Sequence, residues 1–112
     1  MEIRDRLIGN VAVVELAGRL TVNDQPGLLK DAITGIVSRG AQHVLLDLSE
    51  VHYIDSTRLG ELIGAHVTVT RLGGRLKLVR TPPRIAHLLH IAGLGDIFEC
   101  FESIESATSS LG

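Results

Sequence analysis

The sequence has few aromatic rings: it contains no tryptophan, a single tyrosine and two phenylalanines, so it offers few platforms on which nucleic-acid bases could stack. It also lacks a long basic run, and its formal net charge is −2 with histidine neutral. A protein that binds nucleic acid needs a basic surface to meet the phosphate backbone. We therefore expect no nucleic acid among the partners of this chain.

Cysteine and long apolar runs are scarce as well. The single cysteine, Cys100, excludes an internal disulfide and is typical of a protein in a reducing compartment. No apolar run approaches the roughly 18 residues that a membrane-spanning helix requires. The charged start, MEIRDRLIGN, lacks the apolar centre of a signal peptide. These observations favour a cytoplasmic location without direct membrane insertion.

The length of 112 residues fits one domain that spans residues 1–112. Apolar spacing predicts strands and helices in the order ββαβαβαβα, with the strands over residues 3–8, 11–16, 44–48, 75–79 and 97–101. Gly9-Asn10 is a hairpin signal between the first two strands. Strands separated by helices pair in parallel through right-handed crossovers. We predict an α/β fold: a mixed, mostly parallel sheet with an N-terminal antiparallel hairpin and helices packed against it.

Local signals refine this pattern. Asn23 or Asp24 is expected to cap the first helix, with Pro26 in its first turn. Gly35 lies inside that helix, where glycine costs about 1 kcal/mol relative to alanine, and we interpret it as a point of close packing on the sheet. The alternation of charged and apolar residues over residues 75–79 predicts a strand that has one solvent-exposed face or lies at the edge of the sheet.

The chain is organised around residues 45–64, LLDLSEVHYIDSTRLGELIG. An apolar run, Val44–Leu48, is typical of a buried strand and is followed by a short polar stretch. An amphipathic helix is then expected, with its apolar stripe at Leu59, Leu62, Ile63 and Val67. The stretch is therefore interpreted as a strand, a loop and the start of a helix.

The polar side chains of Asp55, Ser56 and Thr57 would lie at the N-terminus of that helix. Backbone N–H groups there lack partners and the helix dipole is positive. Such a position caps a helix, holds an anion or carries a phosphate, and spacing alone leaves these three alternatives open.

The central motif resembles a known family signature. Residues 55–60, DSTRLG, follow an apolar strand and resemble the D-S-S/T-x-L-G motif of STAS domains, whose best-known stand-alone members are anti-sigma-factor antagonists. Gly18-Arg19-Leu20 is similar to the family's G-x-L-D stretch, with Thr21 in the acidic place. Ala92-Gly93-Leu94 followed by Ile97-Phe98 is similar to its C-terminal pattern. The resemblance covers nearly the whole chain and implies the STAS fold.

The resemblance also implies a regulatory function. In the family the second hydroxyl of the motif is phosphorylated, which matches Thr57 here, with Ser56 as the second choice. The implied partners are an anti-sigma-factor serine/threonine kinase and a PP2C-type phosphatase; the unphosphorylated antagonist captures the kinase and frees a sigma factor. The implied partner-binding residues are Asp55, Ser56, Thr57, Arg58 and Leu59.

Arg58 is a departure from the type members, which carry glycine at this position. Its guanidinium could pair with a phosphate on Thr57 or alter the access of the kinase. Apolar residues in the expected loops near the motif would mark a protein interface if they were exposed: Leu20, Val22, Val51 and Ile54.

Other functions are left open by the sequence. The chain could be a scaffold or accessory subunit of a stressosome or a lipid-transport complex, in which the hydroxyl is never phosphorylated. It could also be a sensor that binds a small anion or nucleotide at the same helix N-terminus. An enzyme is not expected, because the hydroxyls have no assigned base, and we expect no cofactor.

A metal site is not expected either. His87 and His90 have a helical i, i+3 spacing that can share a metal, but no third ligand is evident nearby. Asp47 and Asp55 make a weak case for a divalent pair. Asp47 is better interpreted as closing its strand or as accepting backbone hydrogen bonds.

Overall fold

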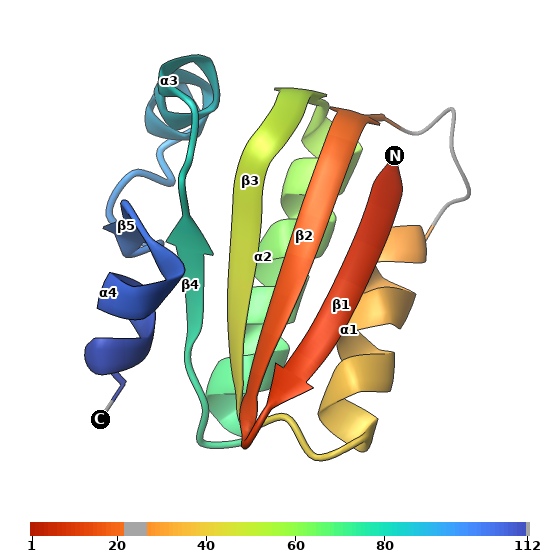
Figure 1. Cartoon of the computed structure of the whole chain (residues 1–112). Helices are drawn as coiled ribbons and strands as arrows, with labels where there is room; N and C mark the ends of the chain where they lie inside the picture. Colours follow the sequence, from red (N-terminus) through yellow and green to blue (C-terminus); the bar gives the residue numbers. More distant parts are fainter. Residues whose placement is uncertain (22–26, 112) are drawn as a thin grey trace.

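The structure is a computed structural model that describes residues 1–21 and 27–111 (Figure 1). The elements in chain order are β1 Glu2–Ile8, β2 Val11–Leu20, α1 Leu28–Ser38, β3 His43–Ile54, α2 Ser56–Arg71, β4 Leu76–Val79, α3 Pro83–Ile91, β5 Cys100–Phe101 and α4 Ile104–Ser109. The predicted order ββαβαβαβα is confirmed. The capping roles predicted for Asn23, Asp24 and Pro26 fall outside the described residues.

The five strands form one sheet in the order β1-β2-β3-β4-β5. β1 pairs antiparallel with β2, and every other neighbouring pair is parallel. The predicted mixed, mostly parallel sheet with an N-terminal hairpin is therefore confirmed. In Figure 1, α1 and α2 lie behind the sheet, and α4 lies on the opposite side, near β4 and β5.

The sheet has an apolar cluster on each face. The larger cluster joins the strands to α1, α2 and α3, and its fully buried members include Leu29, Ile33, Leu46, Leu62 and Leu89. The smaller cluster joins the other face to α4 and contains Val11, Val13, Leu45, Val79 and Ala107. Burial of apolar area contributes about 25 cal/mol per Å², so the larger cluster is the main source of stability. None of the helices in the described ranges is long and apolar enough to cross a membrane.

β3 is longer than the sequence predicted. The polar stretch after Leu48 is not a loop; it continues the strand to Ile54, because it pairs with the second half of β2. The register matches Gly18 with Val51 and Leu20 with Ile54. Paired strands bury their inward side chains, so Leu20, Val51 and Ile54 are 1%, 2% and 4% exposed. They therefore form no exposed apolar patch, and Val22 lies outside the described residues.

β4 is an inner strand, and the expectation of a wet face or an edge position was wrong. It lies between β3 and β5 with all of its residues buried. Its charged residue, Lys77, is 2% exposed and donates a hydrogen bond from Nζ to Ser110 Oγ at 2.8 Å. Nζ also lies 3.3 Å from Glu99 Oε1 and 4.9 Å from the ring centroid of Phe101. A lysine paired in this way can be buried along its whole stem, which the alternation of residue types could not show.

The C-terminal strand is shorter than predicted. Of the predicted residues 97–101, only Cys100 and Phe101 form the strand that pairs with β4. Ile97 lies outside this strand and is exposed. The N-cap of α4 is Ser103, whose side chain and that of Ser106 form a reciprocal capping box. Such a box satisfies two of the otherwise unpaired N–H groups of a helix start.

Candidate functional site

The paired ends of β2 and β3 fix the start of α2. The N–H of Asp55 donates to the carbonyl of Leu20 at 2.9 Å, so the residue after β3 is tied to the last residue of β2. Asp55 is the N-cap of α2, and its Oδ1 accepts a hydrogen bond from the N–H of Arg58 at 2.9 Å. The capping alternative is therefore confirmed for Asp55. A capping carboxylate also complements the positive end of the helix dipole.

The two hydroxyl residues follow the cap directly. Ser56 and Thr57 are the first residues of α2, and both are exposed. Thr57 also lines a groove of about 450 Å³ between α1 and α2, together with Lys30, Gly60 and Glu61. The start of α2 therefore carries two exposed hydroxyl residues, while Asp55 takes the capping role.

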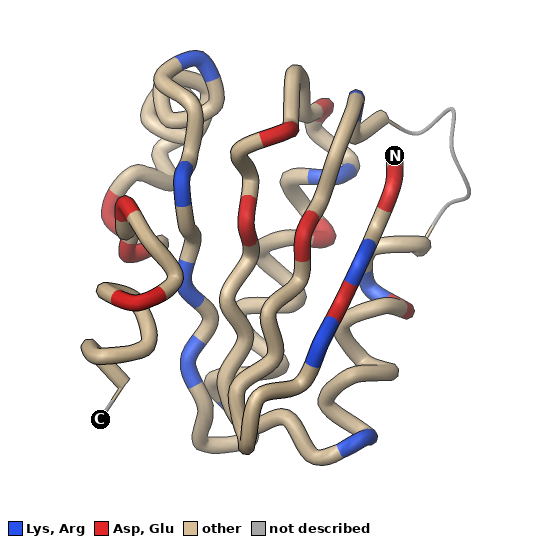
Figure 2. The backbone as a smooth tube through the Cα atoms, viewed as in Figure 1, with Lys and Arg blue, Asp and Glu red and all other residues tan. Residues whose placement is uncertain are grey.

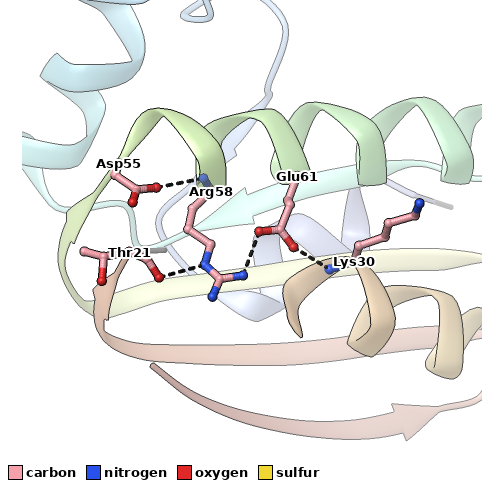
Figure 3. A network of polar contacts seen from close by, with 5 residues as sticks. All are labelled: Thr21, Lys30, Asp55, Arg58 and Glu61. Carbon is pink, nitrogen blue, oxygen red and sulfur yellow. Dashed lines mark hydrogen bonds and ion pairs between the residues drawn. The ribbon is translucent and has the colours of Figure 1, made fainter. Parts of the chain in front are cut away.

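Arg58 lies inside the fold, although it directly follows Thr57 in the chain. Its side chain is 1% exposed, Nε donates to the carbonyl of Thr21 at 3.2 Å, and NH1 lies 2.6 Å from Glu61 Oε2. Glu61 Oε1 accepts in turn from the backbone N–H of Lys30 at 3.3 Å. Figure 3 shows this network between the end of β2 and the starts of α1 and α2. The guanidinium is thus turned away from solvent and engaged by a carboxylate, rather than placed openly beside the hydroxyl.

The buried face of α2 differs from the predicted stripe. Leu62 is buried as predicted, but Val67 is 40% exposed, and the fully buried positions are Arg58, Leu62, Ala65 and Val69. Leu59 and Ile63 are partly buried and pack against the larger cluster. The prediction is therefore confirmed for three of its four residues and wrong for Val67; it also missed Arg58 and Ala65, because it counted only large apolar residues.

Asp47 is a buried carboxylate that forms a separate ion pair with the half-exposed Arg80. It lies within β3, is 3% exposed, accepts from the N–H of Ser49 at 3.0 Å through Oδ1, and pairs through Oδ2 with the guanidinium of Arg80. Burial alone would raise the pKa of this carboxyl, but the hydrogen bonds from Arg80 and Ser49 outweigh it, so its pKa is below the ordinary value. The same pairing raises the pKa of Arg80. The interpretation of Asp47 as an acceptor of backbone bonds is confirmed, while its closing of the strand was wrong.

The described ranges contain no group of three or more histidine, cysteine or acidic residues that could hold a metal ion. His87 and His90 are both exposed on α3.

An exposed aromatic residue, Tyr53, lies near the end of β3. Arg19 of β2 stacks on it, with the Cζ atom of Arg19 5.0 Å from the centroid of the Tyr53 ring.

Sequence reasoning missed Glu61, Lys30 and Arg19 as neighbours of the site. The i, i+3 spacing of Arg58 and Glu61 was a usable signal, because side chains at that spacing share one face of a helix. Figure 2 shows acidic and basic residues on most of the described elements, so their position along the chain does not single out these residues.

The comparisons with known proteins agree with this geometry. The family model for the STAS domain matches residues 2–107. The anti-sigma-B factor antagonist of Bacillus subtilis is 35% identical over 86 residues, which cover 77% of each chain.

Two solved proteins share the fold. An anti-sigma factor antagonist from Mycobacterium paratuberculosis superposes with a TM-score of 0.83 at 22% identity, over 98% of this chain and 92% of that one. The anti-sigma factor antagonist SpoIIAA superposes in its unphosphorylated form with a TM-score of 0.81 at 17% identity, over 97% and 95% of the two chains. SpoIIAA from Bacillus in its phosphorylated form gives 0.75 at 17% identity, over 99% and 100%.

The fold, with residues 55–60 at the start of α2, matches that of STAS domains. The chain belongs to the STAS domain family. Its curated relatives include antagonists of anti-sigma factors.

Proposed function

We propose that this protein is an anti-sigma-factor antagonist switched by phosphorylation of Thr57. In the unphosphorylated state it binds an anti-sigma-factor serine/threonine kinase, which then releases its sigma factor. The kinase phosphorylates Thr57 and thereby ends the interaction, and a PP2C-type phosphatase restores it. The protein itself acts as a regulator and not as an enzyme.

The observation that carries this proposal is the separation of roles at the start of α2. Asp55 caps the helix, so neither neighbouring hydroxyl is needed for that purpose, and the side chain of Thr57 is exposed. The B. subtilis relative is an antagonist of an anti-sigma-B factor, and SpoIIAA, which has the same fold, has been solved in phosphorylated and unphosphorylated forms. Ser56 is also exposed and remains the second choice.

The switch would act through charge and not through refolding. A phosphate on Thr57 adds about −1.5 to −2 charges at pH 7. The positive end of the helix dipole favours an anion there, so α2 should persist. Arg58 is held by Glu61, and Asp55 repels a second anion, so the added charge faces the partner. A partner surface that meets an uncharged hydroxyl would bury this charge unpaired, at a cost of about 3–5 kcal/mol, which reduces affinity by roughly a thousandfold.

The test uses the purified chain, ATP and an anti-sigma-factor kinase from the same genome. Intact mass should show the gain of one phosphate, which T57A abolishes and S56A keeps. Calorimetry should show kinase binding by the unphosphorylated chain only, and a PP2C-type phosphatase should restore that binding. A phosphate that T57A retains would disprove the assignment of the acceptor. Equal affinity of the two forms would disprove the switch.

A further inference from the structure

The start of α1 depends on another helix. The first N–H groups of any helix lack partners within it, and the N-cap of α1 is Gly27, at φ +79°, which has no side chain to supply one. The N–H of Lys30, in this first turn, instead donates to Glu61 Oε1 of α2 at 3.3 Å. A carboxylate from α2 therefore caps α1 from outside.

Glu61 is held in this position by Arg58. Their side chains are 13% and 1% exposed, and NH1 lies 2.6 Å from Oε2. A buried charge pair is tolerated only when both members are well bonded, which restricts both to one geometry. Because Nε of Arg58 also donates to the carbonyl of Thr21, the pair joins the end of β2 to the start of α1 (Figure 3).

This pair lies beside the predicted acceptor. The groove of about 450 Å³ between α1 and α2 is lined by Lys30 and Thr34 from α1 and by Thr57 and Glu61 from α2. The position of the start of α1 therefore determines the shape of the surface next to the Thr57 hydroxyl. That position depends on the contacts of Arg58 and Glu61.

We propose that Arg58 and Glu61 are positioning residues that make the start of α1 part of the surface on which the kinase docks. This inference rests on the proposed function of Thr57. The pair is turned into the fold, whereas Thr57 is exposed, so losing the pair displaces the docking surface and leaves the acceptor hydroxyl in place. The loss should therefore raise the KM for phosphorylation and leave kcat nearly unchanged.

The experiment compares R58M, the double variant R58M/E61M and the conservative R58K with the wild type. R71M, at the exposed C-terminal end of α2, is the matched control. R58M should raise KM about tenfold with kcat within about twofold, because it displaces the docking surface and leaves the acceptor hydroxyl in place. R58K should recover part of the loss. R58M leaves the Glu61 charge unpaired, whereas the double variant removes both charges. The double variant should therefore be more stable than R58M, while its KM stays high.

Hydrogen exchange in the free chain gives a readout that needs no kinase. In E61M the amide of Lys30 should exchange about tenfold faster, while amides at the C-terminal end of α1 should not change. The inference is overturned if R58M and the double variant keep a KM within about twofold of wild type, or if the exchange of Lys30 is unaltered. A wild-type chain that takes no phosphate would overturn the proposed function and the docking role with it, and the exchange at Lys30 would still decide whether Glu61 caps α1.

Discussion

Replacing Thr57 by aspartate should abolish kinase binding while leaving the fold intact. The substitution places a permanent negative charge at the exposed second residue of α2. Interaction with the helix dipole should stabilise the variant by about 0.3–1 kcal/mol. Asp55 and residue 57 have an i, i+2 spacing, so their side chains do not face each other and their repulsion should cost less than the roughly 0.2–0.5 kcal/mol of like-charged i, i+4 pairs. The net change is below about 1 kcal/mol, so Tm should stay within about 4 °C of wild type.

Binding responds differently, because the new carboxylate would be desolvated against the partner. Leaving one charge unpaired in an interface costs about 3 kcal/mol or more, which lowers affinity at least about a hundredfold. T57S keeps a hydroxyl and should bind like wild type. T70D places the same charge near the other end of α2, at an exposed position, and should also bind like wild type.

Thermal denaturation followed by circular dichroism measures the first effect, and calorimetric titration of the kinase measures the second. The reasoning is refuted if T57D binds as tightly as T57S. It is refuted equally if T57D loses the helical signal of α2, because the switch would then act by unfolding.

Three further substitutions test the scaffold. D47N should lower stability by about 1–2 kcal/mol at neutral pH, since it removes the charge with which Arg80 pairs. The loss is limited because the guanidinium of Arg80 is half-exposed and water can partly solvate it. G74A should cost about 3 kcal/mol or more, because an added Cβ would lie 1.7 Å from the carbonyl oxygen of Gln42. G35A should instead stabilise the chain by about 0.5–1 kcal/mol, since a Cβ there meets no atom within 4 Å.

The pH dependence of D47N provides an internal control. The folded-state pKa of Asp47 is lowered, so its contribution to stability is complete above the unfolded pKa of about 3.9 and is lost as pH falls through the folded pKa. The difference in Tm between wild type and D47N should therefore be full at pH 6–7 and shrink below pH 4. A difference that stays constant down to pH 2 would contradict the role of the charge. D96N, at an exposed position, should show no such difference. For the glycine pair, equal effects of G74A and G35A would contradict the packing argument.

The sequence predicted the architecture because periodicity reports burial. The predictions for Val44–Leu48 and for the apolar positions of α1 are confirmed, since both segments bury large apolar side chains in the core. Two of the failures share one cause, which is that tertiary pairing decided the outcome. The polar second half of β3 became a strand through pairing with β2, and Lys77 became a core residue through its contacts with Phe101 of β5 and with Ser110. Gly35 was wrongly interpreted as a close-packing position, because it faces open space.

The candidate site could be predicted only in part. The motif placed Asp55, Ser56 and Thr57 at a helix start because capping residues have a strong positional preference. The motif could not show that Asp55 is the residue that caps the helix. It also could not show that Arg58 faces inward, because Arg58 donates to the carbonyl of Thr21, which lies far from it in the sequence. Which residues contact a partner stays a prediction.

The order of the strands has a further consequence for recognition. In doubly wound α/β sheets, small molecules bind in the crevice where adjacent strands send their connections to opposite faces. Here the strands lie side by side in chain order, and α1, α2 and α3 all contribute to the same apolar cluster. The sheet therefore has no such reversal within its described connections. If Thr57 is phosphorylated as proposed, the active-site pocket that surrounds its hydroxyl during the reaction belongs to the kinase.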